Sequence, residues 1–222
     1  MIKVDLHVHT SYSADSLTLL EHVVLYARRR GLGAVAITDH NTIQGALRLR
    51  RTSGFPIIVG EEVLTTRGEI CGLFLENEIP AGLSPRETVR RIREQNGIVY
   101  IPHPMDRFRG SALEPAALLE VIHDVDAIEV LNARNTLAAD NRLATELAER
   151  YHLLATAGSD AHHALEIGRA YVEMPAFADR DGFLASLAQG TVRGHLSWPL
   201  VHVASTYAKV AKNIREQRLF AR

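Results

Sequence analysis

The sequence predicts an α/β barrel, and two observations lead to it. Short apolar runs alternate with segments of helical length, and several runs lack the polar alternation of half-exposed strands. This alternation is typical of right-handed βαβ units with a parallel sheet. Polar side chains also come directly after the runs, as in α/β barrels, where chemistry gathers at the carboxyl ends of the strands. Seven runs whose polar ends meet at one open end, the mouth of a barrel, favour a barrel over an open sheet.

Seven apolar runs account for the expected strands. They span residues 2–6, 34–37, 57–59, 70–75, 98–101, 127–131 and 153–156. The stretch 62–69 leaves no room for a helix before the next strand, so Arg67 and Gly68 are expected to turn a hairpin. Glu69 would then begin its strand at the same mouth as the other polar residues.

Helix start and stop signals lie between these runs. Residues 18–30 begin with a capping box at Thr18 and end at Gly31. The Ser-Pro pair at 84–85 is a stronger start signal, and Gly97 closes the helix that follows it. Two further helices are expected over residues 137–151 and 179–189.

Length and composition predict one domain spanning residues 1–222. The chain has 46% hydrophobic and 23% charged residues, and its formal net charge of −1 provides no global basic field for nonspecific nucleic-acid binding. Cys71 is the single cysteine, which excludes an intrachain disulfide. No leader or apolar run of roughly 20 residues is recognised, so we expect a cytoplasmic protein without membrane contact or an obligate protein partner.

The C-terminal segment at about 205–222 is expected to be a basic helical tail. It contains five cationic residues and one acidic residue, Glu216. Cations that complement a helix C-terminus explain this pattern better than a nucleic-acid role does.

Four histidine motifs predict a metal site. His7 and His9 lie two residues apart at the end of an extended run, so both imidazoles point to the same side. The other motifs are Thr38-Asp39-His40, Ile101-Pro102-His103-Pro104 and Gly158-Ser159-Asp160-Ala161-His162. Neutral imidazole and carboxylate are the ligands that zinc, manganese and iron(II) take in proteins. Each motif is weak alone, and together they are specific.

In their order, D-L-H-V-H-T, T-D-H, G-E-E, I-P-H-P and G-S-D-A-H, these motifs resemble those of the PHP (polymerase and histidinol phosphatase) family of metal-dependent phosphoesterases. The resemblance spans residues 1–172. It implies a distorted (β/α)7 barrel with the metal site at the C-terminal ends of the strands. It also implies two or three divalent ions, which would be manganese, iron or zinc.

The resemblance further implies that His7, His9 and Asp160 bind one ion and that Glu62 bridges it to a second. A bridging carboxylate is physically reasonable because two dications repel unless shared anions lie between them. Strand parity sends Glu61 and Glu62 to opposite sides, so either could serve. The family places its glutamate second after the glycine, which matches Glu62.

The second ion would be completed by His103, whose flanking prolines restrict its backbone, and by Glu69. Many family members have histidine where this chain has Glu69, and the harder carboxylate shifts the preference toward manganese or iron(II) and away from zinc. If Glu69 is instead an exposed strand-end residue, the second ion is weak or absent. Asp15, His40 and His162 match the third-ion positions of members with trinuclear sites.

Arginines beside the predicted mouth are candidate phosphate clamps. Guanidinium offers two parallel donors to phosphate oxygens, which suits a monoester. Arg134, with Asn132 beside it, is the first candidate for substrate binding, and Arg107 and Arg109 are the next.

The expected activity is phosphoester hydrolysis by a hydroxide held between two ions, with Glu62, Asp160 and His103 at the catalytic centre. Small phosphate monoesters or short nucleotides are the expected substrates; histidinol phosphate, nucleoside bisphosphates and RNA ends stay open. One alternative is a metal-dependent amide or cyclic-ester hydrolase of the amidohydrolase type, because fold does not fix function. Another alternative is a metal-binding accessory module without turnover. The nearly complete ligand set argues against this alternative.

Overall fold

The computed structural model describes residues 1–198, 208 and 212, so the predicted tail at 205–222 lies outside the described residues apart from Ala208 and Lys212. The strands are β1 (Ile2–Val8), β2 (Ala34–Ile37), β3 (Ile57–Thr65), β4 (Gly68–Leu73), β5 (Ile98–Ile101), β6 (Ala127–Asn132), β7 (Leu154–Gly158), β8 (Ala170–Met174) and β9 (Thr191–Gly194). The helices are α1 (Leu20–Arg29), α2 (Gln44–Thr52), α3 (Pro85–Glu94), α4 (Pro115–Val121), α5 (Ala138–Tyr151) and α6 (Arg180–Leu187), with 3-10 turns η1 (Ile122–Asp124) and η2 (Ala164–Glu166). Within this part of the chain, no helix has the length and apolar character needed to cross a bilayer.

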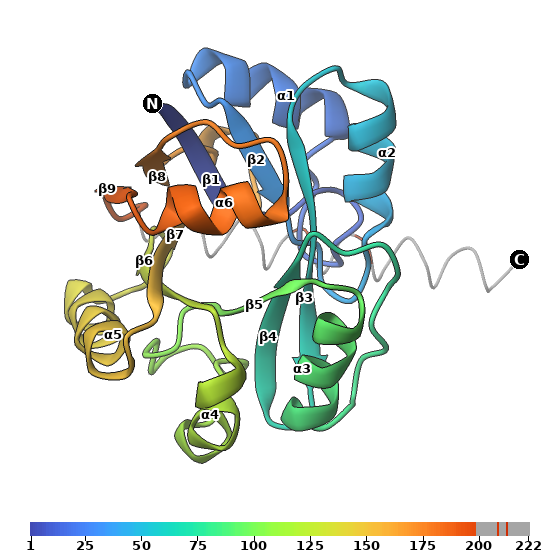
Figure 1. The fold of residues 1–222 in the computed structure, drawn as a ribbon. Coiled ribbons are helices and arrows are strands. Elements are labelled where there is room, and N and C mark those ends of the chain that lie inside the picture. The colour runs from blue at the N-terminus through green and yellow to red at the C-terminus, as the bar shows by residue number, and fades with distance from the viewer. Residues whose placement is uncertain (199–207, 209–211, 213–222) are drawn as a thin grey trace, which may run out of the picture.

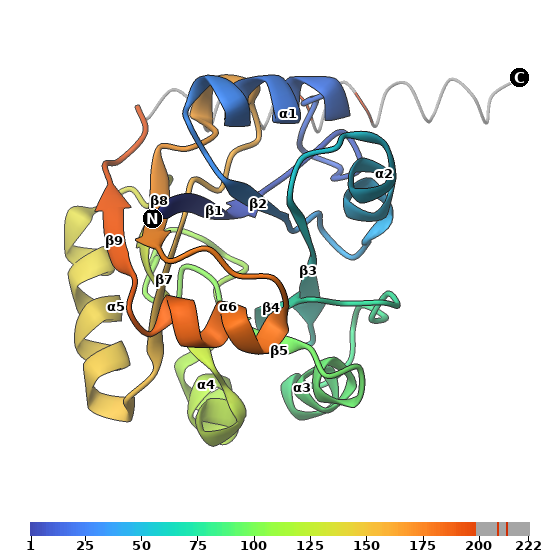
Figure 2. The ribbon, with the colours of Figure 1, turned by 45° about the horizontal axis from the view of Figure 1, so that its top comes forward.

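The strands form one sheet in the order β7-β6-β5-β4-β3-β2-β1-β8-β9, curved into a barrel that Figure 1 shows from the end covered by α6. The predicted α/β barrel is confirmed, and β1 to β7 match the seven expected strands. The (β/α)7 count of the expected distorted barrel is not confirmed. Strand β4 runs antiparallel to both of its neighbours, and the antiparallel pair β8 and β9 adds two strands that the sequence did not indicate. Figure 2 shows α1 to α5 around the outside of the barrel.

The barrel nearly closes where the chain after β7 meets β1. Val8 and Ala161 form a parallel bridge, and the His9 N–H donates to the Ala161 carbonyl at 2.9 Å. The buried Asp5 carboxylate accepts the Ser159 N–H at 2.9 Å and the Ser159 hydroxyl at 2.6 Å. These bonds place the loop that carries Asp160 beside the end of β1.

The barrel interior below the mouth is apolar. Tyr100, Cys71 and Phe183 are all fully buried there, and the Tyr100 hydroxyl donates to the Leu6 carbonyl at 3.0 Å. Phe183 of α6 packs edge-on against Phe74, with 5.2 Å between the ring centroids. The polar residues are therefore confined to the opposite end, and Cys71 is enclosed as the sequence indicated.

Two local predictions had different outcomes. The Ser84 cap of α3 is confirmed, because its side chain accepts the Glu87 N–H at 3.3 Å. The capping box at Thr18 is wrong: α1 begins at Leu20 without a side-chain cap, and the Thr18 hydroxyl donates instead to the His162 carbonyl at 3.0 Å. The Ser16 hydroxyl donates to the same buried carbonyl at 3.0 Å, so two tertiary bonds from this loop satisfy it in place of a local cap.

The predicted hairpin joins β3 and β4, with Leu64 opposite Glu69 and Thr65 opposite Gly68. Gly68 has a φ of +113°, and a Cβ there would lie 2.5 Å from the Ala112 carbonyl oxygen. Only glycine fits this turn, which directs the start of β4 to the barrel mouth.

Candidate metal centre

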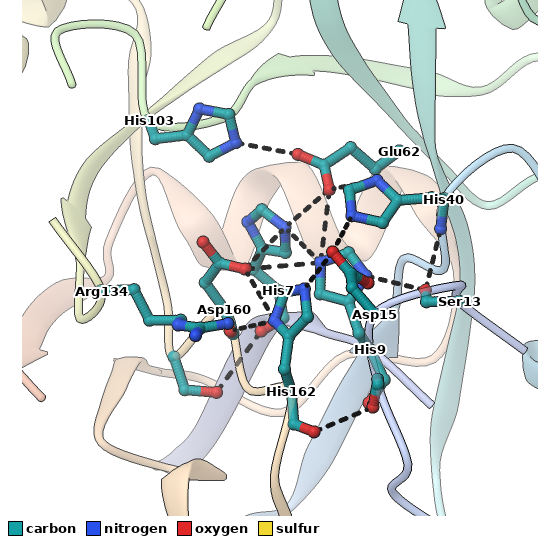
Figure 3. Close-up of polar contacts among 12 residues, drawn as sticks. His7, His9, Ser13, Asp15, His40, Glu62, His103, Arg134, Asp160 and His162 are labelled. Atoms are coloured by element: carbon teal, nitrogen blue, oxygen red, sulfur yellow. Dashed lines mark hydrogen bonds and ion pairs between the residues drawn. The ribbon is translucent and has the colours of Figure 1, made fainter. Parts of the chain in front are cut away.

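The nine side chains that the sequence proposed as ligands all meet at the barrel mouth. His7 lies on β1, Glu62 on β3 and Glu69 on β4, and the others lie on loops that follow strands. The loop after β1 carries His9 and Asp15, the loop after β2 carries His40, the loop after β5 carries His103, and the loop after β7 carries Asp160 and His162. Figure 3 shows most of this cluster, with Glu62 between His103 and the two histidines of the β1 region.

The first ion group consists of His7, His9, Asp160 and one oxygen of Glu62. Glu62 Oε2 lies 3.3 Å from the Nε2 atoms of both His7 and His9, and those two nitrogens are 3.1 Å apart. Asp160 Oδ1 lies 3.7 Å from His7 Nε2 and 3.4 Å from His9 Nε2. Ligands held about 2.1 Å from one ion lie about 3.0–3.4 Å from each other, so this spacing suits a shared cation.

The second ion group consists of Glu62, Glu69 and His103. His103 Nε2 lies 2.9 Å from Glu62 Oε1 and 3.6 Å from Glu69 Oε2. Glu69 is 4% exposed, so it is not a solvent-facing strand residue. Glu61 turns to the other side of β3, where it accepts the Ile79 N–H at 2.9 Å. The structure therefore places Glu62, rather than Glu61, between the two groups.

The third ion group consists of Asp15, His40 and His162. Asp15 Oδ2 lies 3.4 Å from His40 Nε2 and 3.2 Å from His162 Nε2. Burial and the neighbouring His9 lower the pKa of His162 to about 4, so its imidazole is neutral and keeps a lone pair for an ion. His40 also reaches the second group, since its Nδ1 lies 3.4 Å from Glu69 Oε1.

The Nδ1 partners of His7 and His9 leave the two Nε2 atoms available to a cation between them. His7 Nδ1 lies 3.2 Å from the acceptor-only carboxylate of Glu129, which places the proton on Nδ1. The Ser13 hydroxyl donates to Asp39 Oδ1 at 2.8 Å, so its oxygen is left to accept from His9 Nδ1 at 3.0 Å. When both imidazoles are neutral, as metal binding requires, both Nε2 lone pairs face each other across 3.1 Å, and a cation between them removes the repulsion.

Unpartnered oxygens and the local charge agree with this fit. Asp160 Oδ1 and Glu69 Oε2 are buried and accept no hydrogen bond within the described residues. Burial lowers the pKa of His7, but the Glu62 and Asp160 carboxylates outweigh it and raise that pKa well above its usual value. The cluster thus favours positive charge at its centre, and the donor set suits divalent ions.

Two of the residues predicted to bind substrate have partners within the protein. The Asn132 amide is used inside the protein, because Nδ2 donates to Glu129 Oε2 at 2.9 Å and to Asp160 Oδ2 at 3.1 Å. Arg107 pairs with Asp140, with Nη2 2.9 Å from Oδ1. It is not among the residues that line a cavity at the barrel mouth. Sequence position alone could not separate these partners from the groups that face the cavity.

Arg109 and Arg134 do line that cavity, which has a volume of about 630 Å³ and is bordered by Asp15, His40, Glu69 and His162 of the ion groups. Arg109 pairs with Asp160 Oδ2 through Nη2, and its Nε lies 3.5 Å from Asp106. Arg134 Nε lies 3.4 Å from Glu166. The two guanidinium groups therefore border the cavity from the loops after β5 and β6.

Sequence reasoning missed Glu129, Ser13 and Asp39 as partners of the ligands. Glu129 is a charged residue inside the otherwise apolar run of β6, and that pattern was a usable signal. Asp39 accepts the Thr10 N–H at 2.6 Å in addition to the Ser13 hydroxyl. It shapes the loop after β1 but contributes no ligand atom to the three groups.

Comparisons with known proteins decide the family. A family model described as PHP-associated matches residues 138–192. Two uncharacterized proteins of Methanocaldococcus jannaschii are each 38% identical to this chain, one over 64% of this chain and 89% of its own length, the other over 78% and 70%. This chain belongs to the PHP family.

Solved structures share the PHP fold at lower identity. A two-domain protein from Bacteroides vulgatus, containing a predicted PHP-like metal-dependent phosphoesterase, matches with a TM-score of 0.68 and 19% identity over 87% of this chain and 65% of that chain. Endonuclease Q, in complex with a 27-mer duplex substrate with an abasic lesion, matches with a TM-score of 0.60 and 14% identity over 85% and 56%. At these identities the likeness concerns the fold.

The position of Glu69 gives a prediction about metal preference within the PHP family. With two carboxylates and one imidazole, the second ion group is harder than a group with one carboxylate and two imidazoles. Glu69→His should shift the preference toward zinc, and Glu69→Ala should weaken the second ion and lower kcat. Metal stoichiometry and kcat measured with manganese and with zinc test this; identical behaviour of the three proteins would remove Glu69 from the ligand set.

Proposed function

We propose that this protein is a metal-dependent hydrolase acting on phosphate esters, with small monoesters or short nucleotides as substrates. The position of Glu62 carries this proposal. Its two oxygens lie between imidazoles of two ion groups, beside a cavity that two arginines line. A carboxylate shared by two groups suits a pair of ions on either side of it.

The protein residues have separable roles in this proposal. The first and second ion groups would hold two ions, and the third group would hold one more. Bound divalent ions would neutralise phosphate oxygens and lower the pKa of a water at the site. Arg109 and Arg134 would bind the remaining phosphate oxygens through paired N–H donors. The apolar barrel interior below the cluster excludes water from one side, which strengthens these charge interactions.

Two observations support the substrate class. A cavity of about 630 Å³ has the size of small-molecule sites, which favours a monoester or a short nucleotide. The net charge of −1 gives no broad positive field for holding a long duplex, although endonuclease Q, a protein of the same fold, was solved with a 27-mer duplex substrate. Short nucleotides and RNA ends are therefore included among the proposed substrates.

Activity with and without metal ions tests the proposal. Protein freed of metal by strong chelation should not hydrolyse phosphate esters, and manganese should restore turnover. The substrate panel should contain phosphomonoesters, phosphodiesters, and amide and cyclic-ester substrates, with metal content measured on the same samples. Turnover of phosphate esters by fully metal-free protein contradicts the mechanism, turnover of amides alone supports the amidohydrolase alternative, and ion binding without turnover supports the accessory module.

Replacing Arg134 with alanine should raise KM for a phosphomonoester and leave metal content nearly unchanged. Loss of a charge-assisted contact typically costs about 1.5–3 kcal/mol, which corresponds to about 10–150-fold in KM. Arg107→Ala is the matched control, because Arg107 pairs with Asp140 instead of lining the cavity. An unchanged KM in Arg134→Ala would assign the clamp to Arg109.

A further inference from the structure

Glu129 is a buried carboxylate that contacts ligands of two ion groups. It lies on β6 with 1% of its surface exposed. Its Oε1 lies 3.2 Å from His7 Nδ1, and its Oε2 accepts the His103 N–H at 2.8 Å. The same Oε2 accepts the Asn132 side-chain amide at 2.9 Å. One side chain thus connects elements that lie far apart in the sequence.

The contact with His103 acts on the backbone of that ligand. His103 has a φ of +32°, which is unfavourable for a residue with a Cβ. Such a conformation persists only where the surroundings hold it, and the N–H bond to Glu129 is one such restraint. The resulting orientation points His103 Nε2 to Glu62 Oε1, 2.9 Å away.

The contact with Asn132 extends the connection to Asp160. The second amide donation of Asn132 goes to Asp160 Oδ2 at 3.1 Å, which leaves Asp160 Oδ1 facing the nitrogens of His7 and His9. The Asn132 Oδ1 is itself held by the Arg134 N–H at 2.8 Å, so the amide cannot flip without losing that bond. Glu129 therefore influences two ligands of the first group and one of the second.

We propose that Glu129 is a positioning residue that couples the first and second ion groups, so that both groups lose affinity together when its charge is removed. The proposal rests on the ion-binding part of the proposed function. Glu129 orients His7 by accepting its Nδ1 proton, orients Asp160 through Asn132 and restrains the backbone of His103. Partners of this kind typically change metal affinity by about 10–100-fold.

Titration of metal-free protein with Mn²⁺, in the absence of substrate, tests the coupling. The variant is Glu129→Gln, which keeps the size and a hydrogen-bonding oxygen. The control is Glu61→Gln, another buried carboxylate, which faces Ile79 and no ion group. We expect Glu129→Gln to weaken both the first and second classes of Mn²⁺ sites by about 10–100-fold, with Glu61→Gln binding as the wild type does. The thermal midpoints of the two metal-free variants should be similar.

A second variant separates coupling from a general packing defect. Asn132→Ala removes the link to Asp160 but keeps the bond from His103 to Glu129, so it should weaken the first class of sites more than the second. The coupling would be overturned if Glu129→Gln bound Mn²⁺ as tightly as the wild type does. It would also be overturned if that variant lost affinity in only one of the two classes of sites. If Glu129→Gln does not fold, equal weakening of both classes by Asn132→Ala overturns it. Absence of Mn²⁺ binding by the wild type would instead reject the ion centre itself.

Discussion

Glu62→Gln is expected to prevent two metal ions from binding side by side at the centre, and hydrolysis should be lost with them. Glu62 Oε2 lies within 3.3 Å of His7 Nε2 and His40 Nδ1, and Oε1 lies 2.9 Å from His103 Nε2. A glutamine keeps one acceptor oxygen but places an N–H₂ donor against an imidazole nitrogen, and it removes the negative charge that offsets repulsion between two dications. Because Glu62 would be a direct ligand, kcat should fall by more than the roughly 100-fold upper range of outer partners.

The measurement combines Mn²⁺ stoichiometry with kcat on the best phosphomonoester of the panel. Glu61→Gln is the matched control, since it lies next to Glu62 on β3 but points to Ile79. If Glu62→Gln retained both ions and its kcat, Glu62 would not be a bridging ligand, and the proposed assignment of the centre would have to be abandoned.

Gly158→Ala should strongly destabilise the barrel. A Cβ at this position would overlap His7 Cβ and would lie 2.6 Å from Glu129 Oε1 and 2.9 Å from His7 N. These neighbours belong to β1 and β6, so neither can withdraw without disturbing the sheet. We expect a loss of about 3 kcal/mol or more in the free energy of unfolding, which lowers the thermal midpoint by about 6–12 °C.

Gly110→Ala is a suitable comparison, because no atom lies within 4 Å of the added Cβ and the backbone is not in the left-handed region. It should change the thermal midpoint little, while Gly158→Ala should also weaken Mn²⁺ binding by displacing His7. Equal thermal midpoints for the two variants would show that β1 and β7 can separate without cost at this point.

Much of the centre could be predicted because its ligands follow strands. The two-residue spacing of His7 and His9 places both imidazoles on one side of β1, and no tertiary contact is needed to see this. His40, His103 and Asp160 come at the ends of apolar runs, where a barrel gathers its loops. The hairpin that brings Glu69 to the mouth was visible as well, because too few residues separate Glu62 from the next strand to form a helix.

The partners of the ligands could not be predicted in the same way. Asn132 and Arg107 stand beside ligand motifs, yet their side chains are used by Asp160 and Asp140. Thr18 has the pattern of a cap, yet it donates to the His162 carbonyl. Each of these side chains had both a local and a distant option, and burial of the distant group decided between them.

The sequence by itself determined the barrel, its seven principal strands and the residues that converge at its mouth, because hydrophobic period and strand ends are local properties of the chain. Only the tertiary structure decided between Glu61 and Glu62, the burial of Glu69 and the connection that Glu129 makes from His7 to His103. These features depend on which strands become neighbours and on how the barrel closes between β1 and β7. Contacts across that closure join residues more than 100 positions apart, such as His7 and Glu129, whose separation is 122.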